Sequence, residues 1–122
     1  MSQRDAMRRS ASQFLRPGET IQAVFAARTV IPMETGQALP SMLASTQDRR
    51  RIIAVTDQRI LLLRSGLLQR TARSMLTGVS RSRRIGPPSG LRYVFHLGPE
   101  KLRVTRRFFP DIETADSHLA SG

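Results

Sequence analysis

The sequence predicts a mainly β protein, an antiparallel barrel or sandwich with a helix covering one open end. Two short apolar runs, Ile52 to Val55 and Ile60 to Leu63, flank a polar centre of four residues, as expected for two buried strands joined by a turn. Apolar residues alternate with polar ones in several other segments, whereas helical spacing occurs only near the two ends of the chain. Strands that follow one another without intervening helices favour an antiparallel architecture.

A short helix is expected at the N-terminus, over Arg4 to Leu15. Met7, Ala11 and Phe14 recur at helical spacing on one face, and a Pro-Gly pair after Arg16 ends the pattern. A basic amphipathic helix of this kind can lie on an anionic membrane, fray, or dock on its own domain, and we expect docking. We therefore divide the chain into an N-terminal arm, residues 1–18, and one domain, residues 19–122.

The first strand is predicted from Thr20 to Val30, where Ile21, Ala23, Phe25 and Ala27 share one face. The segment that follows, residues 29–50, shows no period and contains two prolines and a glycine. A connection of about 20 residues inside a compact domain is usually functional or disordered. Both possibilities remain open for this segment.

A β-hairpin is predicted over Arg51 to Arg64. Its β-branched residues suit a pleated and packed surface. Asp57 stands in the polar centre and is expected to bond the backbone two residues on, which favours a tight turn.

The second half of the chain holds further strand candidates. Residues 70–76 are predicted as an irregular strand. Residues 79–85 are predicted as a solvent-exposed strand or an edge strand, because they carry mostly serine and arginine. Gly86 to Gly90 must form a loop, since its consecutive prolines cannot supply ladder donors. Leu91 to Leu97 and Lys101 to Arg106 alternate clearly and are predicted as a second hairpin, with Leu102 and Val104 facing inward.

The chain is expected to close with a helix. Phe108, Ile112, Ala115 and Leu119 are spaced four, three and four residues apart, which places them on one helical face. Pro110 suits the first helical position, and two acidic residues suit the positive end of the helix dipole.

Charge is the unusual property of the composition. Lys plus Arg number 20 against nine Asp plus Glu, a net charge of +11, and every cation but one is arginine. Polyanions are the natural partners of such a chain, namely nucleic acid, an acidic membrane surface or an acidic protein. The alternative is that arginine use follows genome composition and that the charges are merely solvated.

The chain contains no cysteine, which rules out disulfides, thiolate metal sites and a cysteine nucleophile. The first residues do not resemble a secretory signal, and no run approaches the roughly 18 apolar residues of a membrane-spanning helix. We therefore expect a cytoplasmic protein, in one version peripheral at the inner membrane surface.

Clusters of arginine are the candidate site for an anion or a partner. Side chains two residues apart on a strand point to the same side, so adjacent strands could form one basic face. The opposing interpretation is separated, solvated charges, or Arg84 and Arg106 paired with carboxylates. The candidate residues are Arg49, Arg50, Arg51, Arg81, Arg83, Arg84 and Arg103.

Catalysis finds little support. His96 falls on a predicted strand and His118 in a last helical turn, and such histidines are more often structural than catalytic. The sequence contains no metalloprotease, hydrolase or P-loop motif, and its carboxylates are scattered. We therefore predict neither an enzyme, nor a metal site, nor a cofactor.

Four motifs resemble small actinobacterial proteins of the bacterial pleckstrin-homology-like group. They are LRPGE at 15–19, VTDQRILLL at 55–63, GPPSGL at 86–91, and RRFF at 106–109 followed by Ala115-Asp116, so the resemblance spans roughly residues 15–117. It implies a strongly bent, seven-stranded antiparallel barrel or sandwich capped by a C-terminal helix. This fold carries phosphoinositide binding, peptide binding and scaffolding alike. The chain departs from the lipid-binding pattern, because no lysine lies in its first two strands or the loop between them.

These observations favour a non-enzymatic binding or scaffolding domain that docks on an acidic membrane surface or an acidic protein through its arginine clusters. The alternative is non-specific binding of nucleic acid through the basic surface. Only six aromatic residues occur, and Phe25, Tyr93 and Phe95 fall on inward strand positions, which leaves few platforms for stacking bases.

Overall fold

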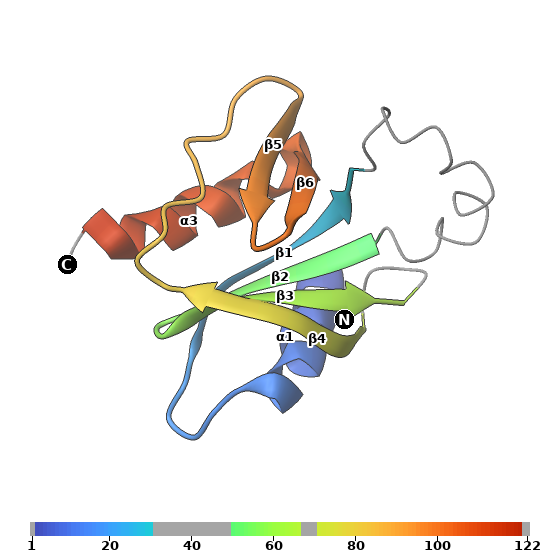
Figure 1. The fold of residues 1–122 in the computed structure, drawn as a ribbon, viewed down its shortest axis with the longest axis vertical. Helices are drawn as coiled ribbons and strands as arrows, with labels where there is room; N and C mark the ends of the chain where they lie inside the picture. Colours follow the sequence, from blue (N-terminus) through green and yellow to red (C-terminus); the bar gives the residue numbers. More distant parts are fainter. Residues whose placement is uncertain (1, 31–49, 67–70, 121–122) are drawn as a thin grey trace.

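The computed structural model describes residues 2–30, 50–66 and 71–120, and in them six strands form one antiparallel sheet that curls into a half-barrel (Figure 1). The strands follow the order β4-β3-β2-β1-β6-β5 across the sheet. The main elements are α1 (Gln3–Ala11), β1 (Ile21–Thr29), β2 (Arg50–Thr56), β3 (Arg59–Ser65), β4 (Ala72–Ser80), β5 (Arg92–Leu97), β6 (Glu100–Thr105) and α3 (Phe109–Ala120). Short 3-10 turns, η1 (Ser12–Phe14) and η4 (Arg106–Phe108), adjoin the two helices. The mainly antiparallel prediction with a helix near each end is confirmed, and the described residues contain six strands.

The predicted hairpin forms the middle of the sheet as β2 and β3. Ile52 pairs with Leu63 and Val55 with Ile60, and the apolar side chains on both faces are buried. Continuous apolar runs of this kind are typical of strands that are covered on both sides.

The turn of this hairpin differs from the prediction. The hydroxyl of Thr56 accepts hydrogen bonds from the backbone N–H groups of Gln58 and Arg59, at 3.1 and 2.9 Å. The carboxylate of Asp57 instead accepts from the backbone N–H of Thr20, at 3.0 Å. Asp57 therefore ties the hairpin to the start of β1, because the threonine already supplies the local acceptor.

β1 joins the two parts of the sheet. It pairs with β2 from Ile21 to Arg28, but with β6 at two positions, Arg28 and Thr29. The β5–β6 hairpin consequently stands away from the other strands (Figure 1). The predicted inward face of β1 is buried, and Val24 and Ala26 on its other face are buried as well.

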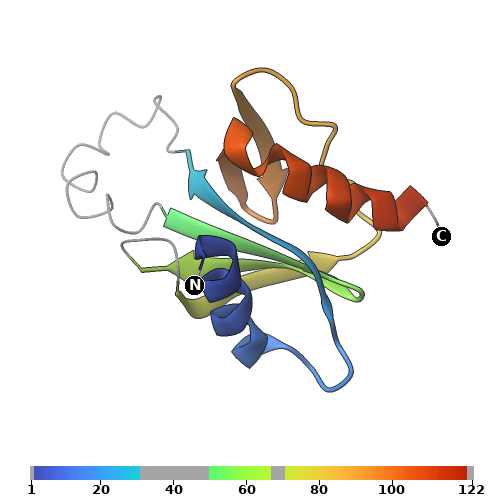
Figure 2. The ribbon, with the colours of Figure 1, turned by 180° about the vertical axis from the view of Figure 1, so that it is seen from behind.

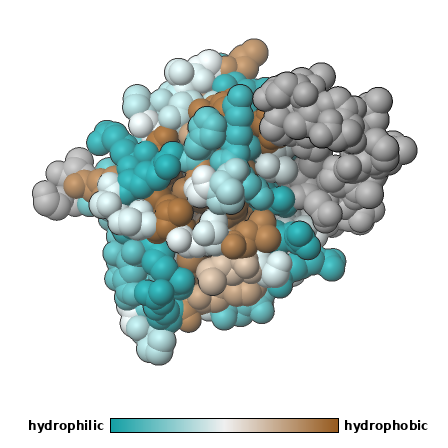
Figure 3. Space-filling model, in the orientation of Figure 1, coloured by the Kyte–Doolittle hydropathy of each residue, from teal (hydrophilic) through white to brown (hydrophobic). Residues whose placement is uncertain are grey.

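Both helices lie on the same side of the sheet in Figure 2, α1 in front of β2–β4 and α3 in front of the β5–β6 hairpin. Met7 and Ala11 of α1 have no exposed surface, which confirms that the N-terminal helix docks on its own domain. Ile112 and Ala115 of α3 are buried in the same way, as predicted. The opposite side shows hydrophobic atoms between hydrophilic ones (Figure 3).

The predicted polar strand over residues 79–85 is wrong beyond Ser80. The chain turns there, and Arg81 becomes a buried side chain whose guanidinium donates to Gln22 Oε1 and to the carbonyl of Ala115. The strand ends at Ser80 because the Arg81 side chain must turn inward to reach acceptors on β1 and α3. The loop predicted from Gly86 is confirmed, and Asp116 accepts the backbone N–H groups of residues 85 and 86.

A buried carboxylate secures the connection between α1 and β1. Glu19 has a fully buried side chain and accepts two hydrogen bonds from Arg59, at 3.0 and 2.9 Å, and one from the Thr56 hydroxyl, at 2.6 Å. The hydrogen bonds from Arg59 are the main reason that the pKa of Glu19 is lowered from 4.5 to about 2. Charge-assisted, bidentate pairing is the strong form of this interaction.

We expect Glu19→Gln to lower the free energy of unfolding at pH 7 by on the order of 3 kcal/mol, because the carboxylate binds its proton more weakly in the folded state. A lowered folded-state pKa contributes stability above the unfolded pKa, and that contribution disappears as pH falls from 4.5 towards 2. Urea melts at pH 7 and across this acid range measure both effects. Glu113→Gln, which changes an exposed carboxylate, is the matched control. Equal stability of the two variants at pH 7 would contradict the assignment.

Candidate functional site

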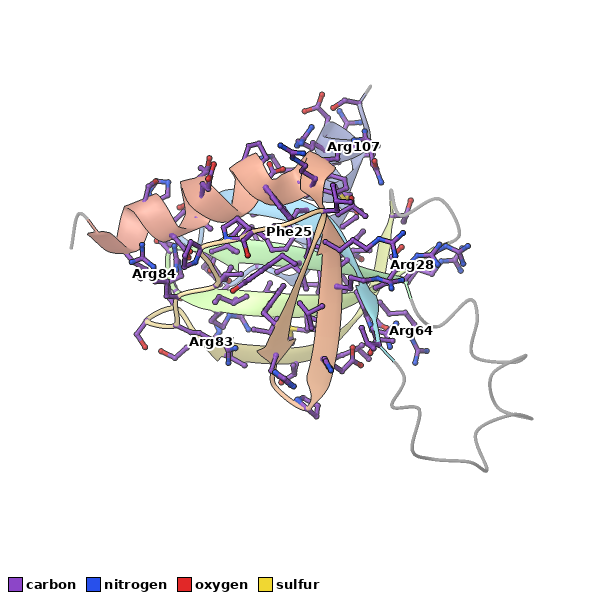
Figure 4. The ribbon with its side chains drawn as sticks, turned by 90° about the horizontal axis from the view of Figure 1, so that it is seen from above. Phe25, Arg28, Arg64, Arg83, Arg84 and Arg107 are labelled. Atoms are coloured by element: carbon purple, nitrogen blue, oxygen red, sulfur yellow. The ribbon has the colours of Figure 1, made fainter. Side chains whose placement is uncertain are left out.

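The predicted arginine clusters do not gather on one face. Figure 4 shows Arg28 at one end of the sheet and Arg83 and Arg84 at the opposite end. Arg83 is exposed, and Arg84 lies 4.0 Å from Asp116 with 60% of its side chain exposed. The predicted residue Arg49 lies outside the described residues.

Two arginines of the predicted site, Arg51 and Arg81, are buried inside the fold. Arg51 is 6% exposed and donates from Nε and Nη2 to the carboxylate of Glu100, at 3.0 and 3.2 Å. Arg81 is buried as described above, and burial lowers its pKa, although the charge of Asp116 opposes this shift. Neither side chain is presented to a partner, since each guanidinium donates to acceptors inside the fold, although Nη1 of Arg81 is buried without a hydrogen-bond partner among the described residues.

The remaining predicted residues belong to an arginine row that crosses three neighbouring strands. Arg50 on β2 is directly opposite Arg28 on β1, and Arg28 is directly opposite Arg103 on β6. Directly opposed residues share one face of an antiparallel sheet, so the three side chains project to the same side. We call Arg50, Arg28 and Arg103 the arginine row.

The arginine row places like charges opposite one another. Neither Arg50 nor Arg103 pairs with a carboxylate among the described residues, and Nη1 of Arg50 is buried there without a hydrogen-bond partner. Like charges directly opposite one another on a sheet are destabilising, by roughly 0.2–1 kcal/mol for each pair. An anion placed at the row would relieve this repulsion.

A pocket of about 260 Å³ opens beside the row. It lies where β1 and β6 stop pairing, so the space between the diverging strands is lined by small and polar residues. The lining residues are Ala26, Ala27, Arg28, Arg92, Arg103, Thr105 and Phe108. Three strands thus bring three arginines to one concave site.

Phe108 forms the apolar wall of this pocket. The guanidinium carbons of Arg4 and Arg107 lie 5.1 and 5.2 Å from the centre of its ring, within the range of cation–π contacts. Arg4 also donates through Nε to both carboxylate oxygens of Asp111, at 3.1 Å, and through Nη2 to the carbonyl of Arg107. The N-terminal helix therefore helps to hold the wall.

Sequence reasoning identified Arg50 and Arg103 but did not select Arg28 and Arg92 as site residues. The predicted clusters consist of arginines close together along the chain, whereas Arg28 and Arg92 each stand apart from other arginines. The available signal was strand parity, because Arg28 and Arg103 both alternate with the residues predicted to face inward, Ala27 on one strand and Leu102 and Val104 on the other.

The part of the chain that the structure describes shows no cluster of metal-binding side chains. No group of three or more His, Asp or Glu side chains there could hold a metal ion. His96 is exposed on β5, and His118 lies in the last turn of α3. None of the described helices has the length and apolarity needed to cross a membrane.

Comparisons of the chain with protein-family models, with curated proteins and with solved structures found no match.

Replacing one member of the row should stabilise the fold. Arg103→Gln is expected to raise the free energy of unfolding by roughly 0.2–1 kcal/mol at low salt, because it removes a like-charge pair. The gain should shrink in about 1 M salt, where charges are screened over about 3 Å. Urea melts at both salt concentrations test this. Arg83→Gln removes the same formal charge from an exposed loop, and a larger gain in that control would contradict the prediction.

Proposed function

We propose that this protein is a non-enzymatic binding or scaffolding domain with a pleckstrin-homology-like fold, which docks on an anionic partner through the arginine row and its pocket. The observation that carries the proposal is the direct opposition of Arg50, Arg28 and Arg103 across three strands at the edge of a concave site. The curled antiparallel sheet and the C-terminal helix support the fold assignment.

Charge compensation supports the choice of partner. The chain carries a net charge of +11, and four of the seven carboxylates in residues 2–30, 50–66 and 71–120 pair with arginines outside the row. Opposing cations on a sheet are retained against their repulsion when a ligand offsets it, which is the usual trade between stability and function at a site. The partner is an acidic membrane surface or an acidic protein segment.

An exposed apolar side chain beside the row favours a membrane surface. Val94 on β5 is directly opposite Arg103 and is 42% exposed. Apolar side chains among cations can enter the lipid interface while arginines contact the anionic head groups. An acidic protein segment would need the charges but not this apolar neighbour.

Nucleic acid remains the weaker alternative. None of the six aromatic side chains is exposed, so the described surface offers no platform on which bases could stack. Phosphate contacts alone would give non-specific binding that falls steeply with salt.

Vesicle flotation tests the proposal. The protein should float with vesicles that contain anionic lipid and not with neutral vesicles. Each arginine adds about 1 kcal/mol near an anionic surface, so the double variant Arg28→Gln/Arg103→Gln should bind roughly 30-fold more weakly. The control Arg9→Gln/Arg83→Gln has the same net charge, with both changes at exposed positions outside the site. Equal losses in the two double variants would reduce the effect to net charge and contradict the proposal.

The apolar neighbour of Arg103 separates the two kinds of partner. Val94→Ser should weaken binding to anionic vesicles severalfold but leave binding to an acidic peptide, such as polyglutamate, unchanged. Binding of polyglutamate without binding to vesicles would assign the site to a protein partner.

A further inference from the structure

We propose that the pocket beside the arginine row binds a phosphate group carried by a small soluble molecule. This inference rests on the proposed function, because it assigns a ligand chemistry to the same basic site. It is carried by three arginines, Arg28, Arg92 and Arg103, which line one cavity from β1, β5 and β6.

The number of arginines indicates the charge of the ligand. A carboxylate is held by a single arginine elsewhere in this fold, as Glu100 is by Arg51. A phosphate monoester carries up to two negative charges and three strong acceptor oxygens. Three arginine forks match such a group, because each planar guanidinium can donate two parallel hydrogen bonds to phosphate oxygens.

The size of the cavity indicates a small ligand. Pockets for drug-sized ligands measure about 300–1,000 Å³, and this one measures about 260 Å³. It therefore suits one anionic group with a short organic attachment. The Thr105 hydroxyl adds a neutral donor, and the two alanines extend the apolar wall formed by Phe108.

The scaffold holds the site in place before a ligand arrives. Arg28, Arg92 and Arg103 all lie within strands, and their backbones are fixed by pairing with Arg103, Thr105 and Arg28 respectively. Phe108 is 5% exposed and is contacted by two other guanidiniums, so its ring is part of the wall and not a stacking surface. Recognition then depends on the phosphate and not on a base or sugar.

Titration of the full chain with glycerol 3-phosphate at physiological salt tests this inference, with backbone amide shifts in NMR as the readout and glycerol and acetate as control ligands. The amide shifts should concentrate at residues 26–28, 92, 103–105 and 108. Glycerol 3-phosphate should bind at least 10-fold more tightly than acetate, and glycerol should not bind. Shifts spread over all exposed arginines, or equal binding of acetate, would overturn the inference.

Variants identify the residues involved. Arg92→Gln and Arg103→Gln should each raise the Kd for glycerol 3-phosphate about 10-fold, the effect expected from losing a hydrogen bond between charged groups. Arg83→Gln should change it less than twofold, because Arg83 lies at the opposite end of the sheet. Urea melts of all three variants show whether the fold is intact, and equal weakening by the three would overturn the inference.

Two outcomes separate this inference from the proposed function. If glycerol 3-phosphate leaves the pocket amides unmoved while Arg28→Gln/Arg103→Gln still loses binding to vesicles, the soluble ligand is wrong and the docking function stands. If glycerol 3-phosphate binds in the pocket while that double variant floats normally, the ligand assignment stands and the docking function fails. Binding of phosphate monoester only as phosphatidic acid in vesicles would assign the pocket to a lipid head group and overturn the soluble ligand.

Discussion

The unequal pairing of β1 is the constraint on which the rest of this structure depends. β1 pairs with β2 from Ile21 to Arg28 but with β6 at two positions, so the sheet must diverge between β1 and β6. The divergence curls the sheet into a half-barrel and gives α3 room to pack on β1. It also leaves the cavity beside Arg28, where a longer ladder would have brought the strands together. Fold and candidate site therefore have one geometric origin.

Charge is distributed unevenly over this fold. Arg51 and Arg59 are largely buried and each meets a carboxylate, since an unpaired charge inside a protein is strongly destabilising. Arg81 is buried too and is held by neutral oxygens of Gln22 and Ala115. The excess of cations therefore appears at the surface, and the register of β1 lines up three of them. Strand pairing, and not clustering along the chain, therefore concentrates positive charge at the arginine row.

Local sequence patterns predicted the helices and strands well. They failed where the end of an element depends on contacts with residues that are distant in the sequence. The apolar runs of the hairpin and the spacing of Ile112 and Ala115 are local, and both elements formed. The end of β4 at Ser80 depends on acceptors that β1 and α3 bring to Arg81, which no window of sequence contains. The site shows the same division, because Arg103 was identified from its own strand, whereas Arg28 and Arg92 join it only through register and curvature.

Arg4 couples two parts of the molecule that are far apart in sequence. It bonds Asp111 in α3 and lies over Phe108, the wall of the pocket, while α1 itself is anchored by Met7. Docking of the N-terminal helix and the shape of the pocket wall therefore belong to one linked equilibrium. By reciprocity, a ligand bound as proposed would tighten the helix on the sheet by the same free energy with which the docked helix favours that ligand. The N-terminal arm would then modulate affinity as well as form part of the core.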